Sequence, residues 1–498
     1  MFTTTTKISN ARMRAPFNTL FGVLAVIALA SCGGGGNSAG SHDSNQPPIV
    51  PPAQIPTPDL RQQRLLSDTE LRTPAIDSAA GLAPPTAEET TWLTQNHYPV
   101  RSIVYDADFS DLAFLPSQLE GKRIVQLGES SHGSAEFSAV KVRLIKYLHE
   151  TLGYNVLAFE SSLTACHIQD LQLEQSAPAP NTGVECAFGI WDTKDLNELA
   201  RYLRSTRQTA HPLRLAGFDI QASSTLDSSD SVLTWLSPLL DRFDPELTNA
   251  ARSLVVDSES DSALIWACID ANQTSCPAFE NHMATTYQRI EEVSQSLHAL
   301  LEATPANNPD HQELTFAWLA IDALSGRLRV LNSYSGYLSG AGEFEFRDPL
   351  MAENLTRLAD LVYPNDKIIV WAHNAHISKD RLDEAGNPSM GSYLSSHWGG
   401  ELASIGLFML RGVSAGNDGS PETVGTPLAG SMEAYMYSLR LGALYLKVGQ
   451  VDAPGSGDDW LFRDTRFYVW GNEESREVFA HGFDGLIIID RSSMPHYN

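Results

Sequence analysis

The stretch IVQLGESSHG, residues 124–133, contains the residues whose types and spacing most clearly suggest chemistry. Glu129 and His132 lie on a turn that follows a short apolar run. An unperturbed histidine titrates near ~6.5, so it can accept a proton at neutral pH, and a neighbouring carboxylate can fix its tautomer and raise its basicity. The pair predicts general-base chemistry. Gly128 and Gly133 are expected to permit tight backbone geometry and close approach of a ligand.

Other ionisable residues occur at the ends of later apolar runs. They are Glu160, Asp219, His373 and His376. Each such residue alone is more often a helix cap, an ion-pair partner or a hydrogen-bonded structural residue. Because parallel strands bring their carboxyl ends to one edge of a sheet, where open α/β sheets bind ligands, the repetition predicts one shared active site.

The chemistry that suits this set is hydrolysis of an acyl group by water, without a covalent intermediate. His132 would act as the general base beside Glu129, and a further histidine such as His373 would donate a hydrogen bond to the developing oxyanion. Arg347 could do the same or hold the carbonyl group of the substrate. We therefore predict His132, Glu129 and His373 as catalytic residues.

Two other chemistries stay open on the sequence alone. Ser130 or Ser131 could be a nucleophile, although the chain contains no G-x-S-x-G elbow and residues so close to His132 on one turn rarely have nucleophile–base geometry. Three histidines with two or three carboxylates could bind zinc, manganese or iron, although H-E-x-x-H is absent. The chain has no Walker A loop and no dinucleotide fingerprint, and we expect neither a cofactor nor a metal.

The apolar pattern predicts an α/β fold, a mainly parallel sheet with flanking helices and a large α-helical insertion. Strands are expected at 124–127, 155–160, 213–219, 366–372, 403–410, 443–448, 466–470 and 485–490. Helices are expected at 134–151, 191–204, 281–303, 312–333 and 347–362. Strand-like runs are missing from 226–345, which predicts a helical insertion that forms a wall or lid over the carboxyl end of the sheet.

The composition limits the class of partner. The chain has 498 residues, with 34 lysines and arginines against 60 aspartates and glutamates, and a net charge of −26. This charge argues against nucleic acid or anionic lipid as a partner, because both repel a negative surface. A small-molecule ester is the expected partner, and the sequence specifies no oligomeric state.

Residues 1–31 are organised like a bacterial signal peptide. Basic residues precede an apolar run at 21–30 that is too short to span a bilayer. The run ends in Leu-Ala-Ser-Cys, which looks like a lipobox and implies cleavage before Cys32 and lipidation of its sulfur. Gly33 at the next position implies sorting to the outer membrane, with the protein facing the periplasm and attached only by its lipid. The alternative is a plain secretory signal, with secretion or display at the cell surface.

The lipidated cysteine is expected to begin a flexible tether, 32–90, that leads into a catalytic domain at 91–498. The tether assignment rests on the Gly, Ser, Asn and Pro content of residues 33–58. The other cysteines are Cys166, Cys186, Cys268 and Cys276. An even number in an exported protein suggests two disulfides, and pairing Cys166 with Cys186 and Cys268 with Cys276 is the most local of three connectivities.

Several motifs in a fixed order resemble one known family. They are LGESSHGSAEF (127–137), VLAFES (156–161), IWDTKDLNELARYLR (190–204), LAGFDIQ (215–221), RDPLMAENL (347–355), VWAHNAHIS (370–378), IGLFMLRG (405–412) and FDGLIIID (483–490). The chain resembles the erythromycin esterase family, bacterial hydrolases that open macrolide lactone rings, over roughly residues 100–492. The G-E-x-x-H-G turn and the H-N-x-H element, with the arginine helix between them, carry the specificity of this resemblance.

The resemblance implies an α/β core with a deep cleft. It implies that His132 activates water beside Glu129. It also assigns residues that bind or position the substrate, namely Glu160, Arg347, His376 and Asp219. An enzyme anchored in the envelope could destroy a macrolide on its way in or serve an envelope ester. Resemblance to iron- or haem-binding lipoproteins of the same broad superfamily makes a metal- or haem-binding envelope protein, or a metal-dependent esterase, the alternative function.

Overall fold

The computed structural model describes residues 84–104, 107–175, 183–271, 273, 275–335, 343–383, 385–449, 454–455 and 457–498. The predicted signal peptide, the lipidated Cys32 and the tether up to residue 83 lie outside the described residues. The described residues belong to one compact unit, 61–498. Its first described helix, α3 (Ala87–Asn96), begins within the segment predicted as tether. None of the helices described is both long enough and apolar enough to cross a bilayer.

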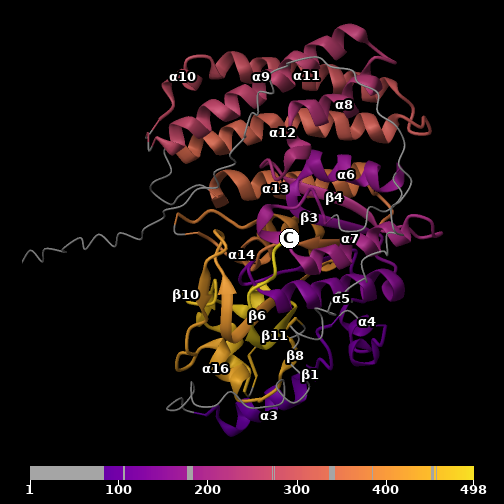
Figure 1. The fold of residues 1–498 in the computed structure, drawn as a ribbon. Helices are drawn as coiled ribbons and strands as arrows, with labels where there is room; N and C mark the ends of the chain where they lie inside the picture. Colours follow the sequence, from indigo (N-terminus) through magenta and orange to yellow (C-terminus); the bar gives the residue numbers. More distant parts are fainter. Residues whose placement is uncertain are drawn as a thin grey trace, which may run out of the picture. The chain divides into compact units, whose positions relative to one another are not determined.

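A nine-stranded sheet forms the centre of this unit (Figure 1). Its strands, in spatial order, are β1 (His97–Pro99), β8 (Ala443–Lys447), β11 (Gly485–Ser492), β6 (Leu402–Ala415), β2 (Ile124–Leu127), β5 (Ile368–Trp371), β3 (Val156–Ser162) and β4 (Arg214–Asp219), with β7 (Pro421–Thr423) beside β6. The run from β11 to β4 is parallel, and β1, β7 and β8 pair antiparallel. The predicted mainly parallel α/β sheet is confirmed.

Strand β2 lies inside the sheet, between β6 and β5, and every residue in it is buried. Val125 and Leu127 belong to one hydrophobic core, whereas Ile124 belongs to the other. Parallel strands that are covered on both faces read as almost continuous apolar runs, which explains why this strand is recognisable from only four residues.

The helix after this strand has both end signals. Ser134 caps α5 (Ala135–Leu152) by accepting a hydrogen bond from the Phe137 backbone N–H, and Gly153 ends it with φ 71°. Besides α3, α5 and the helices given in the next paragraphs, the described residues form η1 (Ser110–Leu112), α4 (Leu115–Gln118), α6 (Leu163–Gln175), η2 (Gly189–Trp191), α7 (Lys194–Thr206), η3 (Thr225–Asp227), α14 (Asn374–Ile377), α15 (Met390–Trp398), η6 (Gly399–Glu401), α16 (Met432–Tyr437), η7 (Asp459–Phe462) and α17 (Phe479–Gly482).

Residues 226–345 contain long helices and no strand among the residues described. The helices are α8 (Ser229–Leu240), α9 (Pro245–Asp270), α10 (Pro277–Glu280), α11 (Met283–Ala303) and α12 (His311–Ser335). Figure 1 shows them as a separate layer, in pink and salmon, beyond α6 and α13 (Asp348–Arg357). Arg327 of α12 donates to the Ile220 carbonyl at 3.1 Å and to Asp227 at 2.9 Å, so the layer is tied to the chain just after the carboxyl end of β4.

Two predicted elements differ from the structure. The strand predicted at 466–470 is β9 (Thr465–Val469), which pairs only with β10 (Glu473–Glu477) in a separate hairpin. The single helix predicted at 347–362 is divided into α13 (Asp348–Arg357) and a π-helical turn, η5 (Leu358–Val362), and Arg347 ends another π-helical turn, η4 (Glu343–Arg347). In the sequence, apolar residues recur about every 3.6 residues along such a segment, and this spacing does not distinguish π-helical turns from an α-helix.

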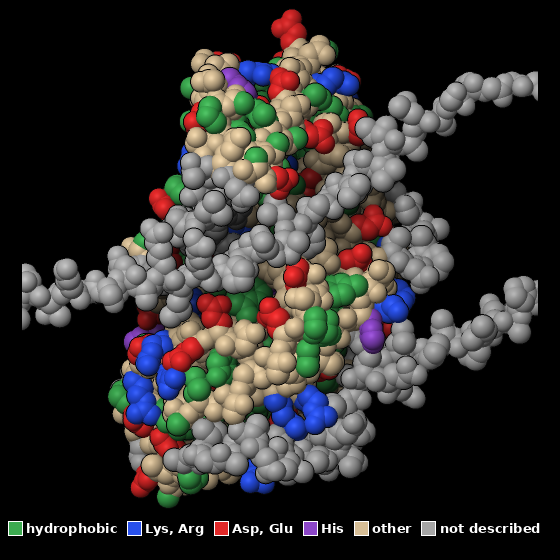
Figure 2. Space-filling view, turned by 60° about the vertical axis from the view of Figure 1, so that its left-hand side comes forward, with side chains coloured by type: hydrophobic (Ala, Val, Ile, Leu, Met, Phe, Trp, Pro, Cys, Tyr) green, Lys and Arg blue, Asp and Glu red, His purple; other side chains and the backbone are tan. Residues whose placement is uncertain are grey.

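Charged side chains are mixed on the face drawn in Figure 2. Acidic side chains are spread over the coloured part of this face, and basic side chains lie beside them in small groups. Among the described residues, exposed ion pairs include Arg466 with Glu474 and Arg476 with Asp464. Pairs of this kind contribute little to stability, because water and salt screen them.

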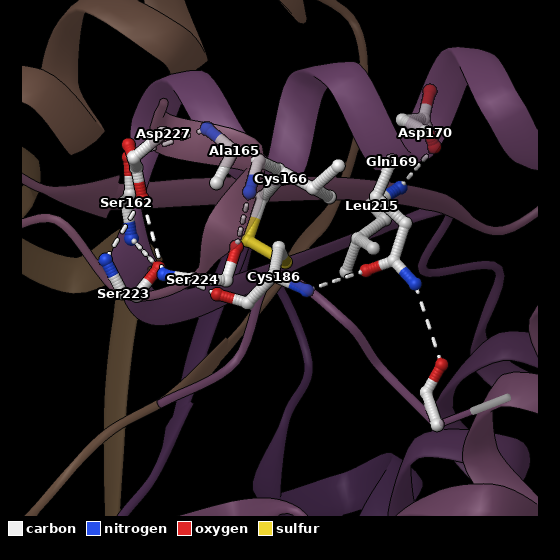
Figure 3. Close-up of a disulfide and its surroundings, with 12 residues drawn as sticks. Ser162, Ala165, Cys166, Gln169, Asp170, Cys186, Leu215, Ser223, Ser224 and Asp227 are labelled. Carbon is white, nitrogen blue, oxygen red and sulfur yellow. Dashed lines mark hydrogen bonds between the residues drawn. A yellow bond between two sulfur atoms is a disulfide. The ribbon is translucent and has the colours of Figure 1, made fainter. Parts of the chain in front are cut away.

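Both predicted disulfides are confirmed, Cys166–Cys186 and Cys268–Cys276. Cys166 lies on α6, directly after β3, and Cys186 lies in the loop that leads to η2 (Figure 3). The Cys186 backbone N–H donates to Gln169 at 2.9 Å, and its carbonyl accepts from the Ser223 hydroxyl at 2.6 Å. The loop before Trp191 is therefore fixed covalently and by hydrogen bonds.

We expect the double variant C166A/C186A to lose about 3 kcal/mol of unfolding free energy, because the disulfide closes a loop with a sequence separation of 20. C268A/C276A is the matched control, since its loop has a separation of only 8 and its loss should be smaller. Urea unfolding of the three proteins measures both losses. An equal or larger loss in the control would contradict the ranking.

Candidate active site

The turn after β2 is held by the chain on both sides. The Ser130 N–H donates to the Leu407 carbonyl at 2.9 Å, and the Glu129 carbonyl accepts from the Asn374 N–H at 2.8 Å. A Cβ on Gly128 would lie 2.0 Å from the Asn374 side chain, and one on Gly133 would lie 2.0 Å from a backbone carbonyl of β6. The expected close approach at these glycines is therefore made by the protein's own chain and not by a ligand.

Glu129 is fully buried and contacts three donors. Its Oε1 lies 2.7 Å from His132 Nδ1 and accepts from the Trp191 indole at 2.9 Å, and its Oε2 accepts from Lys141 at 2.7 Å. Burial raises the pKa of this carboxyl, but Lys141 and His132 outweigh burial and hold the pKa below its usual value. Glu129 is therefore an anion that fixes the ring of His132.

Lys141, which was not predicted as a site residue, is also fully buried. Burial lowers its pKa to about 8 although Glu129 opposes that shift. Its ammonium group lies 4.4 Å from the centre of the Trp371 ring. The sequence does contain a signal for this residue, because Lys141 lies four positions after Phe137 and three before Leu144, on the apolar stripe of a helix. A lysine on such a stripe needs a buried anion.

The hydrogen bond to Glu129 determines which nitrogen of His132 is available. Neutral His132 must carry its proton on Nδ1 to donate to the carboxylate, which leaves a lone pair on Nε2. No residue in the described parts of the chain hydrogen-bonds Nε2, and the side chain retains 12% exposure. The rings of Trp191 and Trp470 contact the imidazole at 4.9 and 5.1 Å between centroids. His132 has the geometry of a general base.

His373 shows the opposite tautomer. Its Nδ1 accepts from the Ala375 N–H at 3.2 Å and so caps α14, which places the proton of the neutral ring on Nε2. Nε2 is buried and has no hydrogen-bond partner among the described residues. Burial and the nearby His132 and His376 hold the pKa of His373 well below its usual value, although Glu160 and the Ser130 backbone carbonyl oppose this shift. This ring lies 5.1 Å from that of His132 and presents an N–H donor that meets no acceptor with hydrogen-bond geometry among the described residues.

Glu160 lies in an irregular part of β3, between residues that pair with β4 in different registers. Its Oε1 accepts from Arg347 at 2.9 Å, and its Oε2 accepts from the His373 backbone N–H at 2.8 Å. Arg347 also donates to Asp219 at 2.5 Å. Burial raises the pKa of Glu160, but His376 and Arg347 lower it to about 2. The ion pairs fix the backbone that carries His373.

His376 is a buried cation between two carboxylates. Its Nδ1 lies 2.8 Å from Asp348, and its Nε2 lies 3.3 Å from Glu160. Burial lowers its pKa, but Asp348 and Glu160 outweigh burial and raise it to about 9. Nε2 is also 3.4 Å from Arg347. His376 and Arg347 are then both cations. The partner of His376 Nε2 is therefore the Glu160 carboxylate, and its contact with Arg347 is an approach of like charges.

The structure brings all of the predicted site residues to one edge of the sheet. Asp219 is the least central, since it contacts Arg347 rather than either of the two histidines with unpaired nitrogens. The residues that sequence reasoning did not assign are Lys141, Trp191, Asp348 and Trp470. Asp348 directly follows Arg347 in the motif RDPLMAENL, and Trp191 lies in the motif IWDTKDL, so both had a sequence signal.

Most ionisable side chains of the candidate site are engaged by the protein itself. Within the described ranges, no group of three or more histidine, cysteine, aspartate or glutamate side chains is arranged to hold a metal ion. Apart from the Nε2 atoms of His132 and His373, the side chains of the site contact one another, lysine or arginine, or backbone N–H groups.

Comparison with known families and proteins points to one family. The profile of the family described as erythromycin esterase matches residues 149–492. This range includes Glu160, Arg347, His373 and His376, while Glu129 and His132 precede it. The chain is 29% identical to the putative hydrolase YbfO of Bacillus subtilis (strain 168) over 420 residues, which cover 80% of this chain and 90% of YbfO. It is 25% identical to erythromycin esterase type I of Escherichia coli over 307 residues, which cover 58% and 70% of the two chains.

Solved structures share the fold. The crystal structure of a succinoglycan biosynthesis protein superposes with a TM-score of 0.67 at 16% identity, covering 84% of this chain and all of that one. A mutant of the erythromycin esterase EreC in its open conformation superposes with a TM-score of 0.57 at 20% identity, covering 78% of this chain and 96% of that one. Identities this low establish the fold alone.

We expect Lys141→Met to cost about 3–5 kcal/mol of unfolding free energy, because it leaves Glu129 buried without its ammonium partner. Lys146→Met on the same helix is the matched control. Its ammonium lies 3.9 Å from the half-exposed Glu150, so its loss should cost less than about 1 kcal/mol. Chemical unfolding of both variants measures the difference, and equal costs would contradict the assigned role of the buried pair.

The stability contributed by His376 should depend on pH. Its folded pKa of about 9 lies above its ordinary value, so the contribution is fully present below about pH 6.5 and is lost as the pH rises through about 9. The difference in unfolding free energy between wild type and His376→Asn should shrink by about 3 kcal/mol across this range. The exposed His481→Asn is the control, and the same pH trend there would refute the assignment.

Proposed function

Since the chain belongs to the erythromycin esterase family, a family of hydrolases, we propose that it cleaves a carboxylic ester with a water molecule that His132 activates. One observation carries this proposal. His132 is fixed through Nδ1 by a buried carboxylate, and neither its Nε2 nor the Nε2–H of the neighbouring His373 has a hydrogen-bond partner among the described residues. An acceptor and a donor of protons thus lie side by side at the carboxyl edge of the sheet.

The proposed reaction needs no covalent enzyme intermediate. Nε2 of His132 takes a proton from water while the water oxygen bonds to the ester carbonyl carbon. The carbonyl oxygen becomes an oxyanion, which accepts a hydrogen bond from Nε2–H of His373. When the C–O bond of the ester breaks, the imidazolium returns its proton to the departing alkoxide. The products are the carboxylic acid and the alcohol, and His132 is regenerated.

The buried charges assist this cycle in different ways. The Glu129 carboxylate stabilises the imidazolium that forms on His132, and Lys141 and Trp191 keep that carboxylate in place. Glu160 accepts from the His373 backbone N–H and so fixes the start of α14. Arg347 and His376 hold Glu160. We propose that Arg347 also contacts the acyl part of the substrate.

A macrolide lactone such as erythromycin is one candidate substrate, and an ester of the cell envelope is the other. The named erythromycin esterases among the relatives support the first. We propose that the protein is an outer-membrane lipoprotein facing the periplasm, on the basis of its signal-like N-terminus and Cys32. The two disulfides support an oxidising compartment, because such bonds are rare in the reducing cytosol of mesophiles.

His132→Ala should lower kcat by about 10²–10⁴ with the fold unchanged, because the general base is lost. His481→Ala is the matched control, since this histidine is exposed and contacts Asp380 far along the chain from the turn. Ser130→Ala and Ser131→Ala should each retain the histidine-dependent rate. The assay is a panel of macrolides and simple esters, with mass spectrometry for the addition of water.

Three results would contradict the proposal. Turnover of His132→Ala near the wild-type rate would show that His132 is not the general base. Loss of turnover in a folded serine variant, with an acyl adduct on that serine in wild type, would establish the nucleophile mechanism. Stoichiometric metal after dialysis, together with loss of hydrolysis in chelator, would establish a metal-dependent esterase.

A further inference from the structure

Trp470 has a backbone conformation that tryptophan rarely adopts. It follows β9 in the hairpin with β10, where the Asn472 N–H donates to the Val469 carbonyl at 3.3 Å. Its φ is 56°, and that of the next residue, Gly471, is 80°. A positive φ is unusual for a residue with a bulky side chain, and Gly, Asn and Asp are the residues that adopt it most readily.

Backbone hydrogen bonds fix this strained turn next to the candidate active site. The Trp470 N–H donates to the carbonyl of Ser130 at 2.7 Å, and Ser130 directly follows Glu129. The Gly471 carbonyl accepts from the Gly425 N–H at 2.6 Å. The tip of the hairpin therefore moves only if the turn that carries Glu129 and His132 moves with it.

The indole contacts both histidines whose nitrogens are unpaired. It stacks face to face on His373, with 4.5 Å between ring centroids and 20° between planes. It meets His132 edge to face at 5.1 Å and 70°. If Trp470 served only to hold the hairpin to the turn, the backbone hydrogen bond would suffice. An Asn-Gly pair could then replace Trp470 and Gly471 without strain. Strained residues persist where the surrounding structure requires their side chain, and here the side chain reaches the two imidazoles.

We propose that Trp470 is a positioning residue for hydrolysis, which holds the His373 ring face to face so that its Nε2–H donor stays fixed beside His132. This inference rests on the proposed function of the site. The indole limits rotation of the imidazole about its side-chain bonds and covers one of its faces against water. Trp191 contacts His132 at 4.9 Å, so the two tryptophans together confine the base.

The protonation state of His373 gives an independent sign of this role. Burial is the largest cause that holds its pKa well below the usual value, and the stacked indole is part of what buries it. The ionisable groups around this ring are His132 on the β2 turn, Glu160 in β3, His376 on α14 and Arg347 before α13. Loss of the indole admits water on one face, so the pKa of His373 should rise towards its ordinary value.

Two substitutions distinguish a positioning role of the Trp470 side chain from a role in filling space. Trp470→Asn suits the positive φ at this position and removes the ring, whereas Trp470→Phe keeps a ring that can stack. We expect Trp470→Asn to lower kcat by about 10² with KM little changed and the fold intact, because a misplaced group near the reacting atoms costs about that much. Trp470→Phe should recover most of the rate. The matched control is Arg440→Gly, at the other described non-glycine residue with positive φ, and it should leave kcat unchanged.

A histidine-labelled NMR titration supplies a readout that does not depend on activity. The titration midpoint of the His373 signal, assigned with His373→Asn, should lie at higher pH in Trp470→Asn than in wild type, because burial lowers the pKa of this ring. An unchanged or lower midpoint, or a wild-type kcat in folded Trp470→Asn, would overturn the proposal. A loss confined to KM, or an equal loss in Trp470→Phe, would overturn it too. A wild-type protein that hydrolyses no ester would instead refute the proposed function, and the titration would still decide the role of Trp470.

Discussion

The buried carboxylate of Glu129 is the constraint on which the rest of the site depends. An ionised carboxylate without partners is very costly to bury, so the fold must bring donors to both of its oxygens. The donors come from three places in the chain: Lys141 on α5, the indole of Trp191 in η2, and His132 on the same turn. Their convergence fixes how β2, α5 and the loop before α7 meet, and it fixes the tautomer of the histidine.

A second carboxylate, Glu160, organises the other half of the site. It joins Arg347 and His376 to the backbone N–H of His373, so the second histidine is placed by its own main chain as well as by its neighbours. The Cys166–Cys186 disulfide joins the segments that lead to these two halves, because it links α6, which follows β3, to the loop that leads to Trp191. Covalent and electrostatic constraints thus act on two imidazoles whose Nε2 atoms have no partner among the described residues.

The sequence alone predicts the strands of the parallel run, together with β8 and β9, but not the strands β1, β7 and β10. It also predicts the disulfide pairing, as the most local of three connectivities, and the placement of ionisable residues at one edge of the sheet. These features are local, since a buried parallel strand is an apolar run and its carboxyl end is where the run stops. The sequence does not predict that Lys141 neutralises Glu129 or that Trp470 reaches His373, because both contacts depend on tertiary geometry between distant segments. The antiparallel hairpin of β9 and β10 and the π-helical turns around α13 also depend on packing rather than on apolar period.

The protons on the two imidazoles test the central claim most directly. Neutron diffraction from crystals grown in heavy water, at the pH of fastest turnover, locates each of them. We predict deuterium on Nδ1 of His132 with Nε2 bare, and deuterium on Nε2 of His373 with Nδ1 bare. Deuterium on Nε2 of His132 would rule out this residue as the general base, because that nitrogen could then not take a proton from water.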